Sequence, residues 1–102
     1  MEVQITVLKK LFFQEMAEEY LNNPNSVESC PILDEGMVFI YEGGANMPSG
    51  FCPWAWIDIY KTVSAIASGA TFSSWYNREN MSIECCTDRI RPVIFKIERI
   101  SG

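Results

Sequence analysis

The first segment of the chain alternates apolar and polar residues. Val3, Ile5 and Val7 share one face of it, which is the period of a half-buried strand. The apolar residues then recur at helical spacing, and the opposite face carries glutamine and glutamate. This pattern predicts a strand and then a helix whose apolar stripe consists of Phe13, Met16, Ala17, Tyr20 and Leu21.

Turn signals bound the next two elements. Asn22-Asn23-Pro24 ends the first helix, because proline cannot continue it. The turn Asp34-Glu35-Gly36 precedes the apolar run 37–41, which predicts a second strand buried on both faces or nearly so.

The clearest element is a helix from about residue 53 to residue 68. Pro53 fits its first position, since the missing N–H would be unpaired there anyway. Gly69 fits the left-handed position that follows a helix. The apolar stripe of this helix consists of Trp56, Ile59, Tyr60, Val63, Ile66 and Ala67.

Two further strands are predicted at 81–86 and 92–100, and the short link between them favours an antiparallel hairpin. Val93, Phe95 and Ile97 share one face of the last strand. The element order strand–helix–strand–helix–strand–strand predicts an α+β fold. We expect two helices packed on a small, mainly antiparallel sheet, in one domain spanning 1–102.

Composition narrows the classes of function. Of the 102 residues 48% are hydrophobic and 21% are charged, which is ordinary for a folded globule. The net charge of −5 argues against nucleic acid as a partner, since such binders need a basic face. The chain from Cys85 onward is net positive, however. We interpret this as a solvated strand face, or alternatively as a site for a small anionic ligand.

The sequence predicts a cytoplasmic chain that does not enter a membrane. The N-terminus lacks the basic and apolar stretches of a signal peptide, and no segment approaches about 18–20 apolar residues. Thiols stay reduced in the cytoplasm. Four cysteines and no histidine therefore indicate metal binding, catalysis or core packing before disulfides.

Cys52 is the first candidate site residue, because it directly precedes Pro53 and is the predicted N-cap of the second helix. The unpaired N–H groups and positive dipole end of a helix N-terminus stabilise a thiolate. Cys52 is therefore a candidate nucleophile or metal ligand. The alternative is a small buried side chain in a tight turn.

The other cysteines extend the candidate site. Adjacent strand residues point to opposite faces, so at most one of Cys85 and Cys86 joins a site with Cys52. Cys30 is a further candidate ligand. The set Cys30, Cys52, Cys85 and Cys86 would suit zinc or an iron–sulfur cluster, although no C-x-x-C spacing is present.

Two charged residues follow the paired cysteines. Asp88 is a candidate general base, although an aspartate in such a link more often bonds to its own backbone. Arg91 is a candidate anion ligand, and a structural ion pair with Asp88 is the commoner outcome.

Aromatic residues are candidates for the wall of a binding pocket. Trp54 lies in the first turn of the second helix, off the centre of its apolar stripe. Trp75 belongs to the loop 69–80, which would either cap the core or close over a pocket beside Cys52.

Three motifs resemble those of a family of small conserved hypothetical proteins from bacteria and archaea. They are Gly50 to Trp56 (GFCPWAW), Cys85 to Asp88 (CCTD) and Arg91 to Arg99 (RPVIFKIER). The resemblance spans nearly the whole chain and includes Cys30-Pro31. It implies a domain outline and no catalytic roles. Arg89 stands where the resemblance leads us to expect a glycine, which raises the question of a positive φ there.

Three functions fit these features. The first is a domain that binds a ligand or metal through a cysteine site centred on Cys52. The second is a thiol-dependent enzyme with Cys52 as nucleophile and Asp88 or Arg91 assisting, which the absence of histidine disfavours. The third is an accessory module that binds a partner protein.

Overall fold

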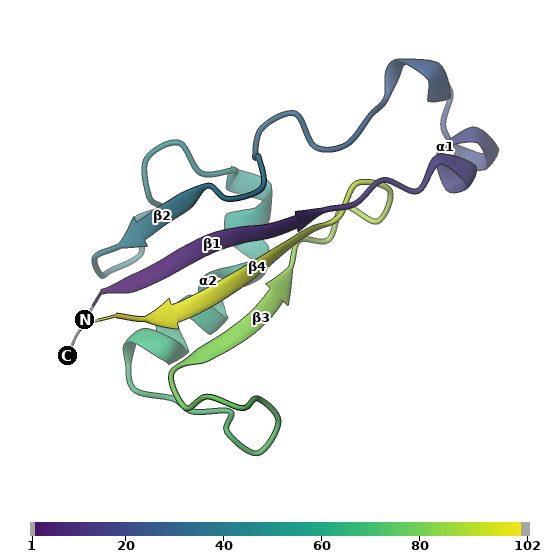
Figure 1. Cartoon of the computed structure of the whole chain (residues 1–102). Coiled ribbons are helices and arrows are strands. Elements are labelled where there is room, and N and C mark those ends of the chain that lie inside the picture. The colour runs from purple at the N-terminus through teal and green to yellow at the C-terminus, as the bar shows by residue number, and fades with distance from the viewer. Residues whose placement is uncertain (1, 101–102) are drawn as a thin grey trace.

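The computed structural model describes residues 2–100. Its elements are β1 (Val3–Lys10), α1 (Gln14–Tyr20), the 3₁₀ turn η1 (Pro24–Ser26), β2 (Val38–Tyr41), α2 (Pro53–Ala67), β3 (Met81–Cys85) and β4 (Val93–Arg99). The strands form one antiparallel sheet in the order β2-β1-β4-β3, and α2 lies across one face of it (Figure 1). The predicted α+β class and element order are confirmed. Met1 and residues 101–102 of the predicted 1–102 domain lie outside the described residues.

The core lies between α2 and the face of the sheet that it covers. Alternate residues of β1 and β4 enter this core, as their period of two predicts. α2 adds residues at helical spacing, so that the two periodicities meet in one apolar layer. The fully buried members include Val3, Ile5, Val7, Ile59, Val63, Ile66, Val93, Phe95 and Ile97.

α1 lies beyond the end of the sheet and not on its face (Figure 1). The chain after β1 stays paired with the β3–β4 link, since the N–H groups of Leu11 and Phe13 donate to Pro92 and Ile90 at 2.9 and 3.0 Å. The helix therefore starts past the last strand residue. Ala17 is buried in it, whereas Phe13, Met16 and Tyr20 of the predicted stripe are exposed and Leu21 is half-buried. The radius of gyration is accordingly 14.8 Å, above the ~13 Å typical of a compact chain this long.

β2 corrects the prediction of a strand buried on both faces. It is an edge strand, paired only with β1, and α2 covers a single face of the sheet. Val38 and Ile40 are therefore 50% and 38% exposed, while Tyr41 on the covered side is buried.

α2 begins and ends as predicted from sequence. Cys52 is its N-cap, Pro53 its first residue, and the Cys52 carbonyl accepts a hydrogen bond from the Trp56 N–H at 2.9 Å. Gly69 has a φ of +98°, a conformation that L side chains rarely adopt. Within residues 2–100 neither helix has the length and apolar character needed to cross a membrane.

The packing of α2 predicts different effects for two isoleucines of the same helix. Ile59 is 0% exposed and Ile57 is 79% exposed. Ile59→Ala should lower the free energy of unfolding by about 2–5 kcal/mol, because it leaves a cavity in the core. Ile57→Ala should change it by less than about 0.5 kcal/mol. Urea unfolding followed by circular dichroism measures both, and equal effects would contradict this orientation of α2.

Candidate functional site

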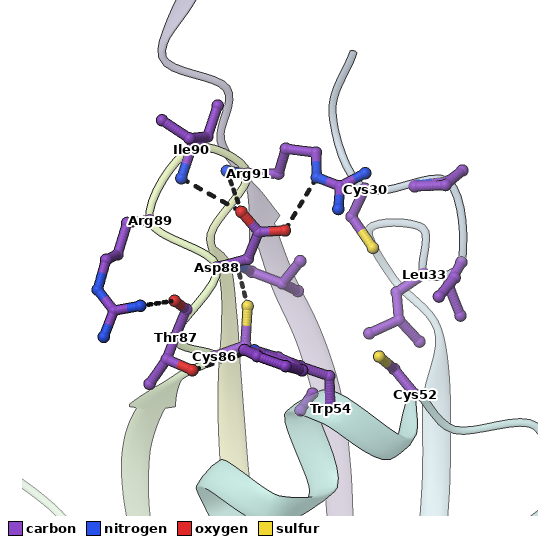
Figure 2. A pocket seen from close by; sticks show the side chains of 14 residues that line it. Cys30, Leu33, Cys52, Trp54, Cys86, Thr87, Asp88, Arg89, Ile90 and Arg91 are labelled. Carbon is purple, nitrogen blue, oxygen red and sulfur yellow. Dashed lines mark hydrogen bonds and ion pairs between the residues drawn. The ribbon is translucent and has the colours of Figure 1, made fainter. Parts of the chain in front are cut away.

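A cavity of about 500 Å³ opens at the N-terminal end of α2. Three segments enclose it: residues 30–33, the first turn of α2 with Cys52, and the link 86–93 from β3 into β4 (Figure 2). Its volume lies in the range of small-molecule sites. The wall is largely apolar and includes Pro31, Ile32, Leu33, Trp54, Ala55, Ile90 and Val93.

The cavity gathers Cys30, Cys52 and Cys86, which the sequence places in three separate segments. All four cysteines of the chain are free thiols. Cys52 is 8% exposed and its side chain makes no capping hydrogen bond. Figure 2 shows its sulfur pointing toward the space between the three segments. Cys52, Cys30 and one of the paired cysteines, which were predicted to lie together, therefore line the same cavity.

The register of β3 selects Cys86 as the cysteine that faces this cavity. The N–H of Val93 donates to the Cys86 sulfur at 3.3 Å, and the Cys86 N–H donates to the Val93 carbonyl at 3.1 Å. Cys85 pairs with Ile94 in the sheet and is exposed. Partial burial of its sulfur raises the pKa of the Cys85 thiol, and the charges of Cys86, Asp58 and Glu84 raise it further. Cys85 therefore lies outside the cavity, and its raised pKa favours the protonated thiol.

The geometry does not support the predicted metal site. Across residues 2–100, no three or more His, Cys, Asp or Glu side chains are grouped so that they could hold a metal ion. Ligand sulfurs must lie about 2.3 Å from zinc, which requires them to converge closely. Cys85 is exposed and does not line the cavity, so the predicted ligands Cys30, Cys52, Cys85 and Cys86 for zinc or an iron–sulfur cluster do not share one site in the described part of the chain.

Asp88 holds the link between β3 and β4 in shape. Its Oδ1 accepts the N–H groups of Ile90 and Arg91 at 3.2 and 3.0 Å, and its Oδ2 pairs with Arg91 Nε at 2.9 Å. Burial alone would raise the pKa of Asp88, but these hydrogen bonds and the Arg91 charge lower it overall. A carboxylate with both oxygens engaged and a lowered pKa is a poor general base. The geometry therefore favours the structural role of Asp88 over the catalytic one.

The same link contains no strained backbone at Arg89. No non-glycine residue among 2–100 has a positive φ, so the arginine fits where the family resemblance predicts a glycine. Its Nη1 donates to the Thr87 carbonyl at 3.1 Å.

A hydrogen-bonded group that the sequence did not indicate ties this link to α2. Asp58 Oδ2 accepts the Thr87 N–H at 2.7 Å, and the Thr87 hydroxyl lies 3.1 and 3.0 Å from the two Asp58 oxygens. The same hydroxyl accepts the Trp54 indole N–H at 3.0 Å. Trp54 and Asp58 are four residues apart and share a face of the helix. In the sequence, this four-residue spacing is the one local feature that relates the two side chains.

The two aromatic residues predicted to line a binding pocket lie in different parts of the structure. Trp54 lines the cavity, as predicted. Trp75 does not line it: the loop 69–80 precedes β3 and lies at the opposite end of the sheet (Figure 1). Trp75 is 82% exposed, and the Tyr76 hydroxyl fixes the loop to the Ile83 carbonyl at 3.2 Å. The loop therefore neither closes over Cys52 nor buries Trp75 as a cap on the core.

The chain was compared with protein-family models, curated proteins and solved structures, and none of the three comparisons gave a match. The resemblance to a family of small hypothetical proteins therefore stays a prediction.

The hydrogen bonds of Asp88 predict a pH-dependent contribution to stability. Because its pKa is lowered by folding, the stabilisation is present above the unfolded value of about 3.9. It is lost as the pH falls through the folded value. Asp88→Asn should thus be less stable than wild type at pH 7, and the difference in free energy of unfolding should shrink below about pH 4. Urea titrations between pH 7 and pH 2.5 test this, and a difference that is constant with pH would contradict it.

Proposed function

We propose that this chain binds a small, largely apolar organic molecule in the cavity beside Cys52. One observation carries the proposal: a cavity of about 500 Å³ whose apolar wall brings Cys30, Cys52 and Cys86 to one place. Mostly apolar walls with a few directed polar groups are typical of ligand pockets. The proposal is the ligand-binding form of the function predicted from the sequence, without a metal.

Hydrogen bonds within the chain hold the walls of the cavity, which supports binding. The Asp58–Thr87 bonds hold the link 86–93 to α2, and the Phe13 N–H holds its far side at the Ile90 carbonyl. Asp88 fixes the loop internally. Walls held by hydrogen bonds lose little conformational entropy when a ligand binds, so more of the contact energy becomes affinity.

Binding is better supported than thiol catalysis. A cysteine nucleophile ordinarily needs a nearby base, and this chain has no histidine. Asp88, the predicted base, is bonded to Arg91 and to two backbone N–H groups. The location of Cys52 at the start of α2 is therefore interpreted as part of a binding wall.

Thiol alkylation gives a direct test, because Cys30 and Cys85 are both accessible. Of these two cysteines, Cys30 lines the cavity and Cys85 does not. The probes are a set of bicyclic aromatic fragments that includes the neutral 2-naphthamide. A bound fragment should slow the reaction of Cys30 with iodoacetamide, because it covers the sulfur, and should leave the rate at Cys85 unchanged. Mass spectrometry of tryptic peptides measures each rate.

Cys85 is the internal control in this experiment. If no fragment slows Cys30, or if every fragment slows Cys30 and Cys85 equally, the cavity does not bind these molecules and the proposal fails.

A further inference from the structure

The polar groups around the cavity divide unevenly between donors and acceptors. The side-chain acceptors are engaged: both oxygens of Asp88, the hydroxyl oxygen of Thr87 and the sulfur of Cys86 each receive a hydrogen bond. The donors are less occupied. A molecule that enters this space meets groups that can give hydrogen bonds, and few side chains that can accept them.

Arg91 is the strongest of these donors. Its Nε bonds to Asp88 at 2.9 Å, and no acceptor within residues 2–100 bonds to its two Nη groups. The side chain is 37% exposed and lines the cavity. Figure 2 shows its guanidinium on the side of the cavity that also carries Cys30. Asp88 accepts only from Nε, so the two Nη groups remain as donors.

The start of α2 adds weaker donors and a favourable field. Pro53 has no N–H and the side chain of Cys52 does not cap the helix. No side chain within residues 2–100 therefore accepts from the N–H groups of Trp54 and Ala55. The positive end of this 15-residue helix favours negative charge nearby. The Cys52 thiol, buried and without a capping bond, points into the same space.

The charges in and behind the wall nearly balance. The charged residues that line the cavity are Asp88, Arg89 and Arg91, one negative and two positive, which gives +1. The whole chain carries −5. The Asp58 carboxylate is bonded to Thr87 directly behind this wall and offsets that charge. The cavity is therefore close to neutral within an acidic protein, and Arg91 supplies its charged donors.

We propose that the ligand is an amphipathic monocarboxylate. Its carboxylate binds the free Nη groups of Arg91, and its apolar body packs against the accessible lining residues Pro31, Ile32 and Trp54. This inference rests on the proposed function and names the class of ligand. The planar guanidinium matches a carboxylate with two parallel hydrogen bonds. A phosphate dianion would leave a charge unbalanced, because Asp88 already neutralises part of Arg91 and the Arg89 guanidinium bonds to the Thr87 carbonyl.

Two molecules of nearly equal shape test the class of ligand. 2-Naphthoate carries the carboxylate and 2-naphthamide replaces it with a neutral amide. Calorimetric titration of the full chain should give about 10- to 100-fold tighter binding of 2-naphthoate, as expected for hydrogen bonds to a charged group. Arg91→Gln should remove that preference and keep the binding of 2-naphthamide. The matched control Arg78→Gln removes the same charge from the exposed loop 69–80, away from the cavity, and should change the preference by less than about threefold.

Arg91→Gln also removes the ion pair with Asp88 and can change the shape of the loop. A second measurement therefore uses the wild-type chain. Nitrogen-15 NMR of the arginine side chains should show the Arg91 resonances shifting with 2-naphthoate and not with 2-naphthamide. Equal affinities for the two probes would contradict the proposal that the ligand is a carboxylate, but not the proposal that the cavity binds a ligand. Tighter binding of 2-naphthyl phosphate than of 2-naphthoate would overturn the monoanion. Failure of both naphthalene probes to bind at millimolar concentration, while other fragments protect Cys30, would overturn the proposed ligand class alone.

Discussion

The hydrogen bonds between Asp58 and Thr87 are the constraint on which the candidate site depends. They join a helix side chain to the backbone and hydroxyl of a residue 29 positions later, at the start of the β3–β4 link. Trp54 donates to the same hydroxyl, so that one side chain both lines the cavity and braces its wall. The Thr87 hydroxyl gives its proton to the carboxylate and accepts from the indole, which satisfies both of its roles. Because these hydrogen bonds hold the wall, the cavity has a defined shape.

The features that local chemistry controls were predicted well. α2 starts at Pro53 and stops before Gly69, because a residue without an N–H suits the first and one that tolerates positive φ suits the second. The alternation in β1 and β4 identified the buried face. The limit of one cysteine from the pair Cys85–Cys86 also followed from strand geometry, and pairing of β3 with β4 then selected Cys86.

The features that depend on distant partners were not predictable in this way. α1 has an apolar stripe, yet Leu11 and Phe13 stay paired with the β3–β4 link and carry the helix past the sheet. β2 is apolar throughout, but Val38 lies on the face of the sheet that α2 does not cover and is exposed. The remoteness of Trp75 from the cavity likewise follows from topology. The residues around Asp58 in the sequence do not indicate that Thr87 is its hydrogen-bond partner.

The candidate site is an apolar cavity at the start of α2, and hydrogen bonds hold its walls. Amide hydrogen exchange at Thr87 in the native chain tests it most directly, because this N–H donates to Asp58 at 2.7 Å. The amide of Arg89, two residues later, is the internal reference, since no acceptor for it is found among residues 2–100. We expect Thr87 to exchange far more slowly than Arg89, as the N–H groups of Ile90 and Arg91 also should. Exchange of Thr87 as fast as that of Arg89 would mean that the wall is not held, and would contradict the account.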